Sequence, residues 1–251
     1  MRGRKLLVPE VRNLTKMIDK SKIKTVFVDV DDTVWWFTEN SKLSLRHVYD
    51  YFGLSRWEPS YEVFRDVYLA KNHELWQLYH HGEITKDFLL AERFRFTLSR
   101  IGVGVGLEEL AKKIDEEYLR FLALQRIVVP GAREMLEYLS SRYRVHVLSN
   151  GFKGVQDLKL ISAGIRHLVD KIIISDDCGI TKPQRGIFDY ALEQCQAQAE
   201  SSVMIGDNAD ADIAGAHNAG WHTIYFNLRG TENCPVADAE VNNLTDVMRI
   251  L

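Results

Sequence analysis

The sequence predicts an α/β protein: a doubly wound parallel sheet with a helical unit inserted after the first strand. Two observations lead to this prediction. Short, continuous apolar runs rich in Val and Ile recur along the 251-residue chain, and helix-like segments separate the later ones. The long stretch between the first and second runs has helical periodicity and no comparable strand. Strands that alternate with helices indicate parallel pairing through right-handed crossovers.

Five runs are expected to be strands buried on both faces, because they do not alternate between apolar and polar residues. They are Thr25–Val28, Val145–Leu148, Ile172–Ile174, Val203–Ile205 and Thr223–Phe226. The helix-like segments of this part of the chain are GAREMLEYLSS, VQDLKLISAG, RGIFDYALEQCQ and DIAGAHNAG. The resulting domain prediction is an amino-terminal extension over 1–22, a core of 23–37 and 127–251, and a helical cap over 38–126.

The cap is expected to pack as a helical bundle. In GLEELAKKIDEEYLRFLALQ, apolar residues from Leu107 to Leu122 recur every three or four positions, which is typical of one buried helix face. The stretch GVGVG at 102–106 has the composition of a dinucleotide-binding loop. It follows no strand, however, and a turn between two cap helices is the better interpretation.

Composition and charge limit the class of partner. The chain has 32 Lys+Arg against 35 Asp+Glu and a net charge of -3, so nothing favours nucleic acid as a ligand. Its three cysteines show no CxxC spacing and are expected to be reduced thiols. No apolar run approaches the length of a membrane span. We therefore expect a cytoplasmic protein, monomeric or homodimeric, with a small molecule as its ligand and neither nucleic acid nor membrane as its partner.

Polar residues follow four of the five predicted strands at the point where each strand ends. They are Asp29, Asp31, Asp32 and Thr33 after the first, Ser149 and Asn150 after the second, Lys182 beyond the third, and Asp207 and Asp212 after the fourth. In an open parallel sheet, the carboxyl ends of the strands form the ligand-binding crevice. Carboxylates from two strands suit Mg²⁺, and a hydroxyl, an amide and a lysine suit phosphate. A bound cation would also explain why three aspartates are tolerated beside a buried strand.

An EF-hand is the alternative source of such closely spaced aspartates. That loop requires Gly at its sixth position and Glu at its twelfth, where this chain has Val34 and Asn40. The EF-hand interpretation is therefore excluded.

Four motifs in the same order resemble those of the haloacid dehalogenase (HAD) superfamily. They are DVDDT at 29–33, SN at 149–150, Lys182 in GITKP and GDNADAD at 206–212. Because they span the whole predicted sheet, the resemblance implies a Rossmann-like core with a cap. It also implies that Mg²⁺ is the cofactor.

The resemblance implies a role for each matching residue. Asp29 would be the nucleophile that forms an aspartyl-phosphate, Asp31 the general acid and base, and Lys182 the cation that screens Asp29 and holds phosphate. The other residues implied in phosphate binding are Asp32, Thr33, Ser149 and Asn150. The metal would be bound by Asp29, by the backbone carbonyl of Asp31 and by Asp207, with Asp212 in support. The acids Asp176 and Asp177 could hold Lys182 or be solvated loop residues.

The substrate class follows from the cap and from Asp31. Dehalogenases of the superfamily lack the second carboxylate of the DxD pair, so Asp31 favours phosphoryl transfer. Within the cap, NHELWQLYHHGEIT at 72–85 is similar to a segment of bacterial 5'-nucleotidases acting on pyrimidine and non-standard nucleoside monophosphates, with Trp76 and Tyr79 as possible contacts to the base. We expect a Mg²⁺-dependent phosphomonoesterase for a nucleoside 5'-monophosphate. The alternatives are a sugar-phosphate or phosphoglycolate phosphatase, and a binding protein that retains the fold without turnover.

Overall fold

The core of the protein is a parallel sheet. The computed structural model describes residues 18–230 and 233–251, and within these ranges the sheet has six strands in the order β3-β2-β1-β4-β5-β6. They are β1 Thr25–Val28, β2 Arg144–Ser149, β3 Lys171–Ile174, β4 Ser202–Gly206, β5 His222–Phe226 and β6 Ala239–Val241. Each adjacent pair is parallel, which confirms the predicted fold class. The predicted extension over 1–22 lies, up to residue 17, outside the described residues.

The sequence does not reveal β6. This strand has only three residues, AEV, and its glutamate is half-buried at the edge of the sheet beside β5. A segment that short shows neither a continuous apolar run nor a clear alternation.

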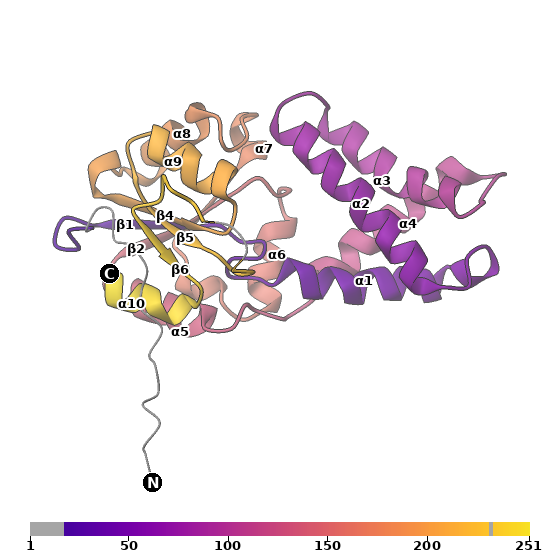
Figure 1. Ribbon diagram of the computed structural model, residues 1–251, viewed down its shortest axis with the longest axis horizontal. Coiled ribbons are helices and arrows are strands. Elements are labelled where there is room, and N and C mark those ends of the chain that lie inside the picture. Colours follow the sequence, from indigo (N-terminus) through magenta and orange to yellow (C-terminus); the bar gives the residue numbers. More distant parts are fainter. Residues whose placement is uncertain (1–17, 231–232) are drawn as a thin grey trace, which may run out of the picture.

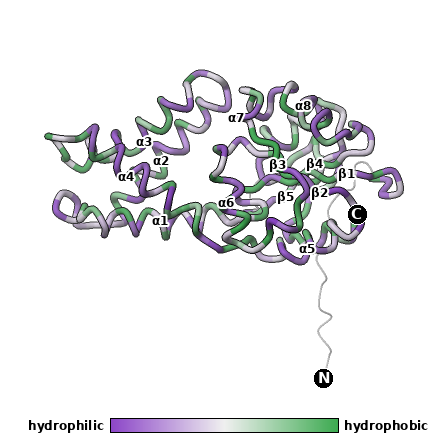
Figure 2. Tube along the Cα trace, turned by 180° about the vertical axis from the view of Figure 1, so that it is seen from behind, coloured by the Kyte–Doolittle hydropathy of each residue, from purple (hydrophilic) through white to green (hydrophobic). Residues whose placement is uncertain are grey.

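Helices cover both faces of the sheet (Figure 1). One face carries α5 Ala132–Ser140, α6 Val155–Ser162 and α10 Val247–Ile250, and the other carries α7 Ser175–Cys178, α8 Arg185–Cys195 and α9 Gly215–Asn218. In β1, Val26 and Val28 face the first layer while Phe27 faces the second. Because the strands are buried on both sides, their sequences are continuous apolar runs. The strands form the hydrophobic centre of the core in Figure 2.

Shorter helical turns join these elements. Four are 3₁₀ turns, η1 Leu54–Arg56, η2 Arg166–Leu168, η3 Ala199–Ser201 and η5 Leu244–Asp246. The fifth, η4 Ala209–Ala214, is a π-helical turn that follows β4 and leads directly into α9.

Four helices between β1 and β2 form a separate group beside the sheet (Figure 1). They are α1 Phe37–Tyr51, α2 Tyr61–His80, α3 Lys86–Arg100 and α4 Leu107–Ala123. The rings of Tyr68, Phe94 and Tyr118 pack against one another at its centre, with centroids 4.6–5.5 Å apart. The expected buried face of α4 is confirmed, and the GVGVG stretch is the turn between α3 and α4.

The two connections between this group and the sheet are bound to each other. The side-chain amide of Asn40 donates to the carbonyl of Ile127 at 2.8 Å and accepts from its N–H at 3.2 Å. The N–H of Val129 donates to the carbonyl of Val34 at 3.2 Å. The chain thus enters and leaves the helical group at one place, and we keep 38–126 as the proposed extent of the cap.

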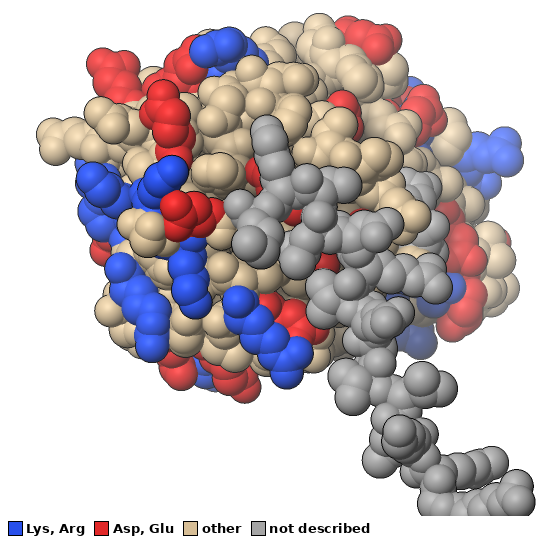
Figure 3. Space-filling model, turned by 60° about the vertical axis from the view of Figure 1, so that its left-hand side comes forward, with Lys and Arg blue, Asp and Glu red and all other residues tan. Residues whose placement is uncertain are grey.

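The surface carries mixed charge. Figure 3 brings forward the side of the molecule away from the cap helices, and there Lys and Arg side chains lie among Asp and Glu. Within the described ranges, no helix has both the length and the apolar composition needed to cross a membrane. Cys178, Cys195 and Cys234 are all free thiols, as the sequence predicts.

Candidate active site

The sheet topology brings three of the predicted site residues to one place. β1 lies between β2 and β4, with Val28 in register with Val147 and with Ile205. The residues that follow, Asp29 after β1 and Asp207 after β4, are therefore neighbours, and Ser149 at the end of β2 lies on the other side of Asp29. This is the point at which the strand order reverses, where open α/β sheets bind their ligands.

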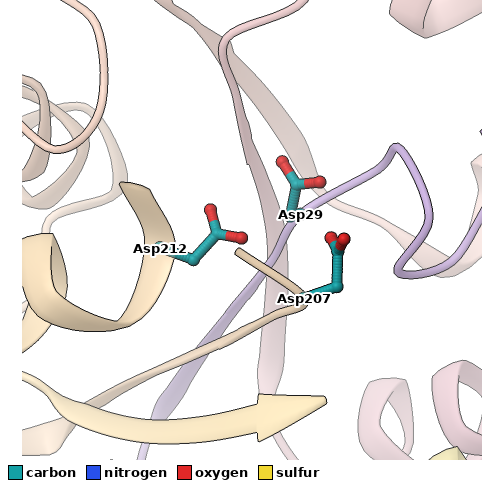
Figure 4. Close-up of side chains that lie close together, drawn as sticks. All are labelled: Asp29, Asp207 and Asp212. Atoms are coloured by element: carbon teal, nitrogen blue, oxygen red, sulfur yellow. The ribbon is translucent and has the colours of Figure 1, made fainter. Parts of the chain in front are cut away.

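Three carboxylates converge there. Oxygen atoms of Asp29, Asp207 and Asp212 all lie within 4.8 Å of one another. Figure 4 shows Asp29 and Asp207 side by side, with Asp212 turned toward them from η4. The approach of Asp212 requires Gly206, because a Cβ at that position would lie 2.2 Å from the Asp212 Oδ2 atom.

The electrostatics of this cluster favour a cation. Burial raises the pKa of Asp29 to about 7, with Lys182 opposing the rise and Asp212 adding to it. Burial and the neighbouring Asp29 and Asp212 raise the pKa of Asp207 well above its usual range. Carboxylates that are buried and lie this close to one another resist ionisation unless a positively charged group binds beside them. A donor set of oxygen atoms alone fits a hard divalent ion such as Mg²⁺.

Lys182 supplies part of that positive charge. Its Nζ donates to Asp29 Oδ1 at 2.7 Å, to Asp212 Oδ1 at 2.6 Å and to the carbonyl of Leu148 at 2.8 Å. Burial works against its charge, but Asp212 and Asp29 outweigh that effect and hold the pKa of Lys182 above its usual range. Two of the three ammonium hydrogens therefore fix the two acids, and the third holds the lysine to the end of β2.

The position of Lys182 is set by Asn150, in a way that the sequence did not indicate. The Asn150 Nδ2 donates to the Lys182 carbonyl at 2.9 Å, and the Oδ1 accepts from the Lys182 N–H at 2.8 Å. Asn150 borders the cavity above the acids, and both ends of its side-chain amide are bound to the Lys182 backbone.

Asp31 is held by two residues that the sequence analysis missed. Its Oδ1 accepts from Lys159 Nζ at 2.6 Å, and its Oδ2 accepts from Gln156 Nε2 at 2.8 Å. The same Gln156 Nε2 donates to Ser149 Oγ at 2.7 Å. Ser149 Oγ also accepts from the Gly151 N–H at 3.1 Å, so its own hydrogen is left to donate to a ligand.

The structure reveals these two residues because α6 turns polar side chains inward and apolar ones outward. Gln156 and Lys159 are buried on α6, whereas the apolar Leu158 and Ile161 on the same helix are exposed. A helix that buries its polar residues beside a strand end is a reason to assign them to a site. The sequence VQDLKLISAG by itself predicts only a helix of the core.

We predict that Gly151→Ala impairs turnover without unfolding the protein. A Cβ at Gly151 would lie 2.0 Å from Gln156 Nε2, so Gln156 must move away from Asp31 and Ser149. Displacing a positioned acid by about 1 Å costs on the order of 10- to 100-fold in kcat. Steady-state hydrolysis of p-nitrophenyl phosphate measures this loss. The matched control is Gly104→Ala, where a Cβ meets nothing within 4 Å, and an equal rate for both variants would contradict the prediction.

The side chains of Asp32 and Thr33 are bound to other groups of the protein, and their part in phosphate binding stays a prediction. The carboxylate of Asp32 accepts from Thr38 N at 2.8 Å and from Thr38 Oγ1 at 2.7 Å, which satisfies the amino end of α1, and the Asp32 N–H donates to the Trp35 carbonyl. The Thr33 hydroxyl donates to Asp207 Oδ1 at 2.9 Å and accepts from Asp207 N at 3.1 Å. These residues position α1 and Asp207, respectively.

Asp176 and Asp177 do not hold Lys182. Asp176 Oδ2 accepts from Lys86 Nζ on the cap helix α3 at 2.5 Å, and Asp177 pairs with Lys153 at 2.8 Å. Lys86 also lies 4.6 Å from the centre of the Phe152 ring. Asp176 therefore links the cap to the core.

A cavity of about 190 Å³ lies above the acids, between core and cap. From the core it is bordered by Asp29, Asp31, Ser149, Lys182, Asp207 and Asp212. Trp76 and His80 on α2 border it from the cap, and burial next to Lys182 lowers the pKa of His80 to about 4. Tyr79 is not among the described residues around this cavity. It packs edge-on against Trp76, and its contact with substrate stays a prediction.

A parallel sheet with a covering helical group and an acidic, lysine-bound site at its strand ends defines a capped hydrolase of the HAD type. The family model for the haloacid dehalogenase-like hydrolases matches residues 23–220, and the chain belongs to this family.

Named relatives narrow the class of reaction. The chain is 33% identical over 208 residues to the pyrimidine 5'-nucleotidase YjjG of Escherichia coli, covering 82% of this chain and 87% of that protein. It is 30% identical over 214 residues to a glyceraldehyde 3-phosphate phosphatase of Methanothermobacter thermautotrophicus, covering 84% and 88%. Family and relatives together make this chain a phosphoric monoester hydrolase.

A solved structure matches over nearly the whole chain. It is the HAD-hydrolase YfnB of Bacillus subtilis bound to magnesium, whose crystal structure reveals interdomain movement in that protein. The match has a TM-score of 0.82 at 27% identity and covers 91% of this chain and 98% of the other.

Proposed function

We propose that the protein is a Mg²⁺-dependent phosphatase that hydrolyses nucleoside 5'-monophosphates through an aspartyl-phosphate on Asp29. The observation that carries the proposal is the cluster of Asp29, Asp207 and Asp212 with the Lys182 ammonium bound to two of them, beneath a cavity bordered by an aromatic cap residue. The relative with pyrimidine 5'-nucleotidase activity supports the substrate class, and the magnesium-bound relative supports the cofactor.

The two steps of hydrolysis are assigned to the chain's own residues. An oxygen of Asp29 attacks phosphorus while Lys182 fixes the carboxylate, the bond to the leaving oxygen breaks, and Asp31 gives that oxygen a proton. Asp31 then takes a proton from the water that attacks phosphorus, which releases inorganic phosphate and frees Asp29. Mg²⁺, held by Asp29 and Asp207, would neutralise charge on the phosphate oxygens.

Asp31 must leave its present partners to donate a proton. In the structure both of its oxygens accept hydrogen bonds, from Lys159 and from Gln156.

We predict that Mg²⁺ stabilises the protein more at pH 8 than at pH 5. The folded-state pKa of Asp29, about 7, lies above the ordinary carboxyl value, so without metal the contribution of Asp29 to stability is present at low pH and is lost as pH rises toward and through 7. Metal binding needs the deprotonated carboxylates and offsets that loss. Thermal denaturation in EDTA and in Mg²⁺ at both pH values measures the effect.

Two variants test this prediction, one at an aspartate of the cluster and one at an exposed aspartate as the control. Asp207→Asn should abolish the Mg²⁺-dependent rise in melting temperature, whereas Asp189→Asn, at an exposed position on α8, should retain it. Equal Mg²⁺ shifts at pH 5 and pH 8, or a full shift in Asp207→Asn, would argue against a metal site at these carboxylates.

The substrate assignment is tested with a panel of phosphate esters in Mg²⁺. Nucleoside 5'-monophosphates should exceed sugar phosphates and phosphoglycolate by at least about tenfold in kcat/KM, because the aromatic cap residue can stack on a base. The similarity to a glyceraldehyde 3-phosphate phosphatase makes a sugar phosphate the second candidate, and a reversed order in the panel would establish it.

A further inference from the structure

Beside the main cavity lies a smaller recess that reaches into the cap. The two hollows share Asp31, Phe37, Trp76 and Gly151, so they adjoin at the proposed general acid. From the cap it is lined by Arg93 of α3 and by Leu119 and Leu122 of α4. Its remaining walls are largely apolar, including Phe152.

Arg93 has a hydrogen-bonding atom without a partner. The side chain is only 3% exposed, and its Nε donates to Asp115 Oδ1 at 2.6 Å. The Nη2 atom is buried and makes no hydrogen bond. A buried donor left unpaired costs on the order of 1–3 kcal/mol, more when the group is charged, so such an atom needs a reason.

A second unpaired atom lies on the neighbouring helix. Asn72 is 6% exposed, and its Oδ1 is also buried without a partner. It precedes Trp76 by one turn of α2 and lies on the same face, since residues four apart are neighbours on a helix. The Tyr68 hydroxyl is a further buried atom of the cap without a hydrogen bond, and of these three residues only Arg93 lines the recess.

We infer, on the basis of the proposed function, that this recess binds the base of the substrate and that Arg93 recognises a ring carbonyl of a pyrimidine. Asp115 neutralises the guanidinium and Lys159 is already paired with Asp31, so the recess favours a neutral acceptor over an anion. The rings of Phe37, Trp76 and Phe152 suit a flat heterocycle. A few placed polar groups within an apolar lining is the usual composition of a small-molecule site.

Entry of a base requires the cap to move. The recess holds about 30 Å³, which is room for a water molecule and far less than a nucleobase needs. Trp76 of the cap stacks on Phe152 of the core, with ring centroids 5.4 Å apart and planes at 26°. Separating these rings opens the recess from the main cavity, and a base can then occupy the space between them.

The inference is tested with Arg93→Lys, which keeps a cation near Asp115 and removes the Nη2 donor. We expect kcat/KM for uridine 5'-monophosphate to fall by about 10- to 100-fold, mostly through KM. Ribose 5-phosphate and p-nitrophenyl phosphate, which carry no pyrimidine, should change by less than about threefold.

A second variant keeps the test valid if Arg93→Lys folds poorly. Arg93→Met combined with Asp115→Leu removes the buried pair together and leaves no unpaired carboxylate. Equal losses on all three substrates, or an unchanged preference for the nucleotide in folded variants, would overturn the role of Arg93 while leaving the nucleotidase proposal intact. A wild-type enzyme that shows no preference for uridine 5'-monophosphate over ribose 5-phosphate would overturn both.

Discussion

Replacing Asp29 by Asn should abolish turnover and leave the protein folded. The carboxylate is the proposed nucleophile, and an amide oxygen is too weak to take a phosphoryl group, so kcat should fall by roughly 10⁴-fold or more. Lys182 retains Asp212 as its partner in the variant, at 2.6 Å, and the buried site loses one of its mutually repelling acids. In EDTA the variant should therefore melt no lower than the wild type.

The covalent step can be observed directly. Mass spectrometry of the quenched reaction should detect a phosphorylated protein in the wild type and none in Asp29→Asn. The control is Asp66→Asn, where the aspartate side chain is 65% exposed on α2 and pairs only with a surface arginine. Residual turnover of Asp29→Asn within a hundredfold of wild type would rule out Asp29 as the nucleophile.

The sheet could be predicted because each buried strand needs a short apolar segment, and such segments are visible in the sequence. Strands buried on both faces need continuous apolar residues, as in TVFV of β1 or SVMIG of β4, and helices must separate parallel strands. The three-residue β6 lies at the edge of the sheet, and only tertiary pairing with β5 makes it a strand. Sequence patterns do not contain that pairing.

The sequence predicts which residues of the site come together only where these residues directly follow strands. Asp29, Ser149 and Asp207 follow strands that are neighbours, so their convergence is a consequence of topology. Whether a side chain faces a ligand or a neighbouring backbone is decided locally. Asp32, for example, has a positive φ of 58°, and its carboxylate turns to the first turn of α1.

Residues contributed by helices were harder to find than those at strand ends. Lys159 and Arg93 each lie within a helical pattern that looks ordinary in sequence, and each is almost fully buried beside an acid from another element. Asp31 and Lys159 pair although they are 128 positions apart in the sequence. A contact between residues this distant does not produce a sequence motif. The burial of Lys159 and Arg93 is a result of tertiary packing, within the cap for Arg93 and beside the end of β1 for Lys159.

Replacing Lys182 by Met should affect both activity and stability. The ammonium fixes Asp29 and would hold the phosphate, so its removal should lower kcat/KM by roughly 10³-fold. It is also the cation that holds the pKa of Asp29 down against burial, so the pKa of Asp29 should rise further above 7 in the variant. An acid with a raised folded-state pKa stabilises the protein at low pH relative to high pH. The loss in stability should therefore be largest at alkaline pH.

Urea denaturation in EDTA at pH 5 and pH 8 measures this difference. At pH 8 we expect Lys182→Met to lose about 3 kcal/mol, the cost of leaving buried carboxylates without their partner, and at pH 5 clearly less, because Asp29 is then protonated. The control is Lys113→Met, an exposed lysine on α4 that pairs only with Glu109, and it should change stability little at either pH. Equal destabilisation by Lys182→Met at both pH values would mean that Lys182 acts through packing. Destabilisation confined to pH 8, and partly reversed by Mg²⁺, would show that this lysine and the metal neutralise the same cluster of carboxylates.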